Sequence, residues 1–286
     1  MPAPVYSLEM QESVGPEPAA VVAGSDAETY TILSGRLDAG VVILCDHAGN
    51  AFPPGYGTLG LAASELERHI AYDVGAAAVT RRLAAALGAP AVLTRYSRLL
   101  IDVNRGLDDP TLIMRLSDGA IVTGNRQLDA AERDQRIRLY YEPYHAAIEG
   151  LIGEALAAGL PPALLSIHSY THMWKGCSRP WHAAVLWDKD PRLARPLLEA
   201  LVAERGLVVG ENEPYSGHLK GDSMWRHGTM RGLAHAIVEI RQDLIRDQHG
   251  QQEWGERLAG VLRRLLAHQH VRRELGFVRR YGSYTD

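Results

Sequence analysis

The sequence predicts an α/β fold in which a largely parallel, mixed sheet lies between two layers of helices. Short apolar runs of strand length recur along the chain and alternate with longer segments of helical pattern. This alternation is typical of a parallel sheet with helices on both faces. Several of the runs end in a polar side chain, and in open sheets of this kind ligands bind beyond the carboxyl ends of the strands.

The expected strands cover residues 41–45, 91–94, 99–103, 163–167, 183–187 and 234–240, with a further short run at residues 207–209. The expected helices cover residues 64–87, 129–156, 191–204 and 251–274. Ser64 and Glu67 have the spacing of a capping box for the first helix, and Gly88 suits its C-terminal end. Pro143 is expected to kink or divide the second helix.

The domain organisation follows from length and composition. A chain of 286 residues can fold as one large α/β domain, which we expect over residues 29–286. Residues 1–28 are rich in Pro, Ala, Gly and acidic side chains and are expected to form a flexible tail. Residues 106–128 are polar and turn-rich and are expected to lie outside the core.

Charge and cysteine content exclude several classes of protein. A net charge of −4 argues against non-specific binding to nucleic acid, and the arginines near the C-terminus are expected to lie on a solvated helix face. Cys45 and Cys177 cannot supply a disulfide framework, which fits a reducing compartment. No segment has the pattern of a signal peptide or a membrane span. We therefore expect a cytoplasmic protein without a membrane partner, and its oligomeric state stays open.

Four expected strands end in side chains that could share one cleft. His47 and His168 close two apolar runs, and Glu239 closes a third. Asn104 and Arg105 follow the run at residues 99–103. Two imidazoles, a carboxylate and a guanidinium are the groups of a metal-assisted hydrolase whose substrate carries a carboxylate. The alternative for each histidine is a hydrogen bond within its own loop.

Glu239 and Arg105 each have a structural alternative as well. A carboxylate next to an apolar strand is costly to bury unless it is paired or used, so Glu239 is favoured as a general base or metal ligand over a structural ion pair. The planar fork of Arg105 suits a substrate carboxylate. Asp102 or Asp108 could satisfy that fork equally well.

A family resemblance becomes visible in the segments that carry these residues, namely 45–50, 97–105, 167–169, 212–217 and 238–244. Together they resemble the N-formylglutamate amidohydrolase family, and the likeness extends over roughly residues 40 to 265. That family is similar in fold to the zinc carboxypeptidases and aspartoacylases. The resemblance therefore implies a zinc-exopeptidase-like fold.

The resemblance also implies one divalent metal, zinc, and a set of roles. His47 and His168 would bind the metal, Glu239 would act as the catalytic base, and Asn104 with Arg105 would grip the substrate α-carboxylate. Asn50 stands where the related enzymes have a glutamate ligand. Because neutral amides are poor zinc ligands, the third ligand stays open between Asn50, Asp46 and Asp73.

The implied reaction is hydrolysis of an N-formyl amino acid, N-formyl-L-glutamate in the family's name, to formate and the free amino acid. The glutamate side chain would need a second cation, for which Arg179 is the first candidate and Arg136 the second. Tyr215 could close over the substrate or could serve packing alone.

Two other functions remain. A cleft without a second cation would favour a different N-acyl amino acid or a small peptide. A metal-free protein that binds a carboxylate is the non-enzymatic alternative, which Asn50 supports.

Overall fold

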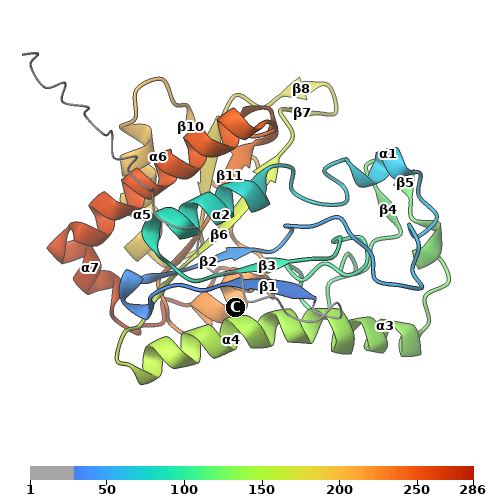
Figure 1. The fold of residues 1–286 in the computed structure, drawn as a ribbon, viewed down its shortest axis with the longest axis horizontal. Coiled ribbons are helices and arrows are strands. Elements are labelled where there is room, and N and C mark those ends of the chain that lie inside the picture. Colours follow the sequence, from blue (N-terminus) through green and yellow to red (C-terminus); the bar gives the residue numbers. More distant parts are fainter. Residues whose placement is uncertain (1–28) are drawn as a thin grey trace, which may run out of the picture.

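A seven-stranded mixed sheet forms the centre of the protein (Figure 1). The computed structural model describes residues 29–286, and the expected tail of residues 1–28 lies outside them. The strands, in their spatial order, are β1 (Tyr30–Leu33), β3 (Ala91–Thr94), β2 (Val41–Cys45), β6 (Ala163–Tyr170), β11 (His235–Arg241), β9 (Ala183–Leu186) and β10 (Val209–Glu211).

Most neighbouring strands run parallel. The exceptions are β1 against β3 and β11 against β9, which pair antiparallel. Strands β2, β6 and β11 lie side by side and parallel in the middle of the sheet. Their carboxyl ends therefore share one edge, as the sequence predicted.

Helices cover both faces of this sheet. The principal helices are α2 (Ala76–Leu87), α3 (Ala130–Arg136), α4 (Glu142–Ala157), α5 (Pro191–Val202), α6 (Gln248–Ala267) and α7 (Gln269–Leu275). Helices α2, α5, α6 and α7 pack on one face and α4 on the other (Figure 1).

The side chains of the buried strand β2 point alternately to the two faces of the sheet, which shows why three layers form. Val41, Ile43 and Cys45 belong to the apolar cluster that includes α2, α5, α6 and α7. Val42 and Leu44 point the other way, into the cluster built on α4. Successive side chains of a strand face opposite sides, so a run that is apolar throughout must be covered twice. The predicted fold class is confirmed.

Two expected elements are wrong. Residues 99–103 form turns rather than a strand, because their backbone bonds are local, such as Leu100 N to Ser97 O and Arg105 N to Asp102 O. The helix expected over residues 64–87 is divided into α1 (Ala63–Leu66) and α2.

Gly75 accounts for the interruption between those helices. It adopts a φ of +82°, and a Cβ at this position would lie 2.2 Å from Ile245 O. The predicted capping box is also absent, because the residue that caps α1 is Ala62, which makes no side-chain cap bond. Gly88 does end α2, in the left-handed conformation.

The remaining helices match their expected places with shifted ends. Asp129 caps α3 through Glu132 N, and a π-helical turn, Ile137–Tyr141, separates α3 from α4 just before Pro143. The last expected helix is divided at His268 into α6 and α7. Small hairpins are formed by β4 (Leu116–Ser117) with β5 (Ala120–Ile121) and by β7 (Met173–Trp174) with β8 (Cys177–Ser178). Within residues 29–286, no helix is long and apolar enough to cross a membrane.

Candidate active site

Two histidines at the carboxyl ends of adjacent parallel strands form the centre of the site. His47 follows β2, and His168 lies near the end of β6. Both residues are buried, and their ring centroids lie 5.0 Å apart. The structure thus brings together the two imidazoles that the sequence predicted to converge.

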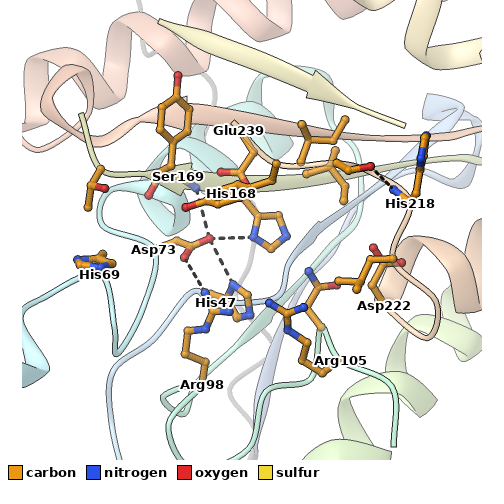
Figure 2. A pocket seen from close by; sticks show the side chains of 18 residues that line it. His47, His69, Asp73, Arg98, Arg105, His168, Ser169, His218, Asp222 and Glu239 are labelled. Atoms are coloured by element: carbon orange, nitrogen blue, oxygen red, sulfur yellow. Dashed lines mark hydrogen bonds and ion pairs between the residues drawn. The ribbon is translucent and has the colours of Figure 1, made fainter. Parts of the chain in front are cut away.

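Asp73 completes this centre from the loop between α1 and α2. Its Oδ2 lies 2.8 Å from Nδ1 of His168 and 3.4 Å from Nδ1 of His47 (Figure 2). One ligand atom from each of the three buried residues lies within 4.8 Å of the others. Two imidazole nitrogens and one carboxylate oxygen form a donor set that holds catalytic zinc and leaves a fourth position open.

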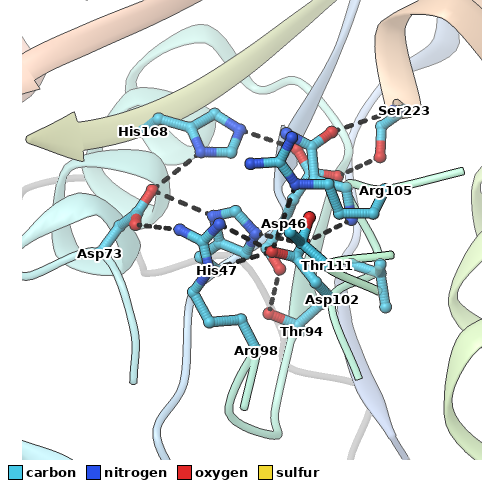
Figure 3. A network of polar contacts seen from close by, with 12 residues as sticks. Asp46, His47, Asp73, Thr94, Arg98, Asp102, Arg105, Thr111, His168 and Ser223 are labelled. Atoms are coloured by element: carbon cyan, nitrogen blue, oxygen red, sulfur yellow. Dashed lines mark hydrogen bonds and ion pairs between the residues drawn. The ribbon is translucent and has the colours of Figure 1, made fainter. Parts of the chain in front are cut away.

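A further carboxylate orients each histidine from behind. Nε2 of His47 lies 2.8 Å from Asp102 Oδ1, and Nε2 of His168 lies 3.0 Å from Asp46 Oδ2 (Figure 3). Metal-binding histidines usually donate their second N–H to such a carboxylate, which fixes the ring and its tautomer. Both rings therefore direct Nδ1 toward Asp73 and toward the space that a metal ion would occupy.

The pKa shifts show that the surroundings favour positive charge at this centre. Burial alone would raise the pKa of Asp73, but His47 and His168 hold it well below its usual range. Burial alone would lower the pKa of His168, but its bonds to Asp46 and Asp73 raise it well above the ordinary value. The carboxylates of Asp46 and Asp73 around His168 therefore favour positive charge at this centre.

Asn50 does not belong to this group. Its side-chain nitrogen donates to Leu66 O at 3.0 Å and lies 3.4 Å from Glu67 Oε1. Of the three candidates for the third ligand, the structure groups Asp73 with the histidines and places Asp46 behind His168. The two imidazoles and the carboxylate of Asp73 fit a divalent ion.

Glu239 lies on β11 directly beside His168 of β6. The residue is only 8% exposed, and within the described part of the chain its Oε2 has no hydrogen-bond partner. Burial raises the pKa of Glu239 to about 7. A carboxyl group with a pKa near neutrality can accept a proton and return it, as a general acid–base catalyst must.

Two arginines add positive charge to the same cleft. Arg98 donates through Nε and Nη2 to Asp102 Oδ2 at 3.0 and 2.7 Å, and its Nη1 lies 3.7 Å from Asp73 Oδ1. Within residues 29–286, the side chain of Arg105 makes only long ion pairs, 3.9 Å to Asp102 and 3.9 Å to Asp109. The guanidinium of Arg105 is therefore far less engaged by the protein than that of Arg98.

Asn104 is fixed on one side and open on the other. Its Oδ1 accepts from Ser223 N at 3.0 Å, and its backbone N–H donates to Asp102 Oδ1 at 3.0 Å. With the oxygen engaged, the amide nitrogen is the part of Asn104 that can bind a ligand. Both Asn104 and Arg105 line the cleft.

Arg179 and Tyr215 contact each other, but only Tyr215 lines the cleft. Arg179 Nη1 donates to Tyr215 Oη at 3.1 Å and lies 3.3 Å from both Thr171 O and Thr171 Oγ1. Arg136, the second candidate cation, donates to Glu132 and Asn125 and does not line the cleft either.

The cleft that unites these residues has a volume of about 380 Å³, within the usual size of small-molecule sites. Figure 2 shows its lining residues around Asp73 and the two histidines. They are His47, His69, Asp73, Arg98, Asn104, Arg105, His168, Ser169, Tyr170, Thr171, Leu186, Tyr215, Ser216, His218, Leu219, Asp222, Ile237 and Glu239.

Sequence reasoning missed Arg98, Asp102 and Asp222 as parts of the site. Arg98 and Asp102 lie within the segment that carried the resemblance, which was the one available signal for them. Asp222 gave no signal, although it is buried in the cleft wall and burial raises its pKa to about 7. Asp73 is one of three alternatives that the sequence offers for the third ligand, and it lies in a segment for which the sequence predicts one continuous helix.

Comparison with known proteins identifies the family of this chain. The sequence model of a family described as N-formylglutamate amidohydrolase matches residues 39–246. The chain belongs to the N-formylglutamate amidohydrolase family. No curated protein matches the chain.

Two solved structures are similar to it over nearly their whole length. The gene product Atu2144 from Agrobacterium tumefaciens is 33% identical, with a TM-score of 0.77, and the match covers 83% of this chain and 94% of that one. N-formylglutamate amidohydrolase from Ralstonia eutropha JMP134 is 24% identical, with a TM-score of 0.63, and the match covers 86% and 98%. The second likeness is one of fold.

Proposed function

We propose that this member of the N-formylglutamate amidohydrolase family is a metal-dependent hydrolase that cleaves the N-formyl amide of an amino acid. The observation that carries the proposal is the centre formed by His47, Asp73 and His168, with a carboxylate behind each histidine. A zinc ion is the proposed cofactor, because the donor set suits it. N-formyl-L-glutamate, from the family's name, is the reference substrate.

The ion would be held by Nδ1 of His47, Nδ1 of His168 and a carboxylate oxygen of Asp73. When bound there, it would supply Lewis-acid polarisation of the amide carbonyl and ease the deprotonation of water. Glu239 takes the proton from the attacking water and returns it to the leaving nitrogen. Water adds to the formyl carbon, the C–N bond breaks, and formate and the free amino acid leave.

The two arginines of the cleft have different roles, one in binding the substrate and one in stabilising the charge that develops during the reaction. Arg105, with the amide nitrogen of Asn104, binds the substrate α-carboxylate, because its guanidinium has no close partner among the described residues. Arg98 is fixed by Asp102 beside Asp73 and stabilises the negative charge that develops on the carbonyl oxygen. Tyr215 forms part of the wall.

Metal analysis of the purified protein, paired with formate release from N-formyl-L-glutamate and other N-formyl amino acids, tests this proposal. We expect close to one metal ion per chain and formate release that a chelator abolishes and added zinc restores. Release of other acyl groups, with no formate, would favour a different N-acyl amino acid. Absence of both metal and turnover after loading with zinc would favour the metal-free binding protein.

A variant separates the proposed base from the metal site. Glu239→Gln keeps the size of the side chain but removes the proton acceptor, so turnover should fall about 100-fold or more while metal content is retained. Near-normal turnover in this variant would contradict the assignment of the base.

A further inference from the structure

The cleft offers one weakly engaged guanidinium, and the proposed function already uses it. Arg105 would bind the α-carboxylate, while Arg98 is occupied by Asp102. Once Arg98 and the groups assigned to metal, base and carboxylate binding are set aside, together with Ser169 and Asp222, the rest of the lining contains no lysine or arginine within residues 29–286. It consists of His69, Tyr170, Thr171, Leu186, Tyr215, Ser216, His218, Leu219 and Ile237.

Arg179 was predicted to bind a side-chain carboxylate, yet it lies behind the wall. Its guanidinium lies over the rings of Tyr215, Trp174 and Tyr170, at 5.0, 5.5 and 5.6 Å. The residue is 8% exposed, and two of these rings, Tyr170 and Tyr215, themselves line the cleft. To reach a substrate, Arg179 would have to leave these rings and its hydrogen bonds to Tyr215 and Thr171.

The two imidazoles in this part of the lining do not replace it. Nε2 of His69 lies 3.5 Å from Asp118 Oδ2, so this ring already faces a carboxylate of the protein, and burial lowers its pKa. Nε2 of His218 lies 4.0 Å from Asp188 Oδ1, and its ring lies against Tyr284 at 4.6 Å. The ring of His218 thus already faces a carboxylate of the protein.

The two acidic side chains of the cleft supply no positive charge for a second carboxylate. Asp222 and Glu239 both line the cleft and are both buried. A carboxylate that leaves water for such a site loses its hydration and gains no cation in return. Leu186, Leu219 and Ile237 offer apolar surface, and Tyr170, Thr171, Tyr215 and Ser216 carry hydroxyl groups.

We propose that the substrate side chain in this enzyme is uncharged, so that its preferred substrates are N-formyl derivatives of amino acids with a neutral side chain of glutamine or methionine size. This inference rests on the proposed function, because the same cleft must hold the α-carboxylate on Arg105. The proposed substrates differ from N-formylglutamate, the substrate in the family's name, only in the side chain of the amino acid.

The experiment compares substrates that differ only in side-chain charge. N-formyl-L-glutamine has the shape of N-formyl-L-glutamate without its second negative charge, and N-formyl-L-methionine has a similar length. We expect kcat/KM for both neutral substrates to exceed that for the glutamate derivative at least tenfold. Equal values, or a preference for glutamate, would overturn the inference.

Arg179→Met provides a matched control. If Arg179 only supports Tyr215, this variant changes kcat/KM for the glutamine and glutamate derivatives by the same factor, and their ratio stays within about twofold. A selective loss for the glutamate derivative would show that Arg179 binds the second carboxylate, and the inference would be wrong.

A binding measurement separates this inference from the proposed function. Calorimetric titration of the zinc-loaded Glu239→Gln variant with N-formyl-L-glutamine and N-formyl-L-glutamate needs no turnover. Tighter binding of the glutamine derivative supports the neutral subsite, and tighter binding of the glutamate derivative refutes it. Failure of the unsubstituted protein to hydrolyse any N-formyl amino acid would refute the proposed function, whichever derivative binds better.

Discussion

The protein contains two pairs of buried histidines whose ring centroids are both 5.0 Å apart, and their surroundings differ completely. In the cleft pair, His47 and His168, each Nε2 meets a carboxylate and each Nδ1 faces Asp73. In the core pair, His145 Nδ1 lies 2.8 Å from His227 Nε2, and neither ring contacts a carboxylate through a hydrogen bond among the described residues.

The hydrogen-bond partners of the core pair fix its protons. Nε2 of His145 lies 3.0 Å from the carbonyl oxygen of Val103 and must therefore donate. Nδ1 of His145 then accepts from Nε2 of His227. Nδ1 of His227 is left as a bare acceptor, without a partner in the part of the chain that the structure describes. We infer that both rings are neutral and that their role is to stabilise the fold.

The direction of the pKa shift follows this difference in partners. Burial lowers the pKa of His145 to about 3, and burial together with His145 lowers that of His227 to about 2. In the cleft pair, the carboxylates outweigh burial and raise both histidine pKa values. The spacing of two imidazoles therefore does not distinguish a functional pair from a structural one, whereas the presence of carboxylate partners does.

The largest expected effect is the loss of metal from the cleft pair. His168→Gln removes a proposed ligand, so the metal affinity should fall more than about 100-fold, because loss of an outer partner alone costs about 10–100-fold. Metal content after dialysis, measured by elemental analysis, should drop from near one ion per chain to almost none. His227→Gln is the matched control and should keep its metal. Equal metal content in both variants would contradict the proposal that the cleft pair binds the metal and the core pair does not.

The next effect concerns a carboxylate behind the cleft pair. Asp102→Asn leaves a side chain of the same shape but weakens its interaction with His47, so metal affinity should fall about 10–100-fold. Competition with a chelator of known affinity measures this loss. Asp190→Asn is the control, because Asp190 is also buried and paired with an arginine, Arg192, but lies outside the cleft. A larger loss in the control would argue against the role of Asp102.

A smaller effect is expected in the core pair. His145→Leu leaves Val103 O and the Nε2–H of His227 without partners, and each buried group left unpaired costs about 1–3 kcal/mol. The free energy of unfolding, measured with urea, should fall by that order while metal content stays near one per chain. Loss of metal in this variant, with stability unchanged, would contradict a structural role.

The last expected effect is a change in the pH dependence of unfolding. Because the folded-state pKa values of His145 and His227 lie below the ordinary value, the unfolded chain binds more protons between about pH 3 and 6.5. Their contribution to stability is therefore present above pH 6.5 and is lost on acidification, by about 1.4 kcal/mol per pH unit for each histidine.

The double variant His145→Gln/His227→Gln isolates this contribution. Its unfolding free energy should depend less steeply on pH between 7 and 5 than that of the unsubstituted protein, and the difference cancels the effect of other groups. Identical slopes would show that the core pair does not titrate as described.

Where the sequence predicted the fold correctly, the apolar pattern decided the structure. Residues 41–45 and 163–167 are apolar almost throughout and form strands β2 and β6, buried on both faces. The turns at residues 99–103 have the same apolar composition, and Leu99, Leu100, Ile101 and Val103 are indeed buried. Periodicity measures burial there and cannot distinguish a strand from a packed turn.

The candidate site was predictable where a side chain follows a strand and was missed where it depends on a break in a helix. The positions of His47, His168 and Glu239 were predictable because the carboxyl ends of parallel strands lie at the same edge of the sheet. Asp73 lies between α1 and α2 in a segment whose composition favours helix, and the break at Gly75 is imposed by Ile245, far away in the sequence. Long-range packing of this kind leaves no local signature.

Asp46 connects the site to segments that lie far apart in the sequence. Its carboxylate bonds to Tyr144, Ser166, His168 and Ser223, which are 98, 120, 122 and 177 residues away in the sequence. Contacts between distant residues close large loops and are the slow steps of folding, because the loss of chain entropy precedes any gain from the contact. We therefore expect a refolding chain to acquire the orientation of His168 only after these distant segments have met in the central sheet.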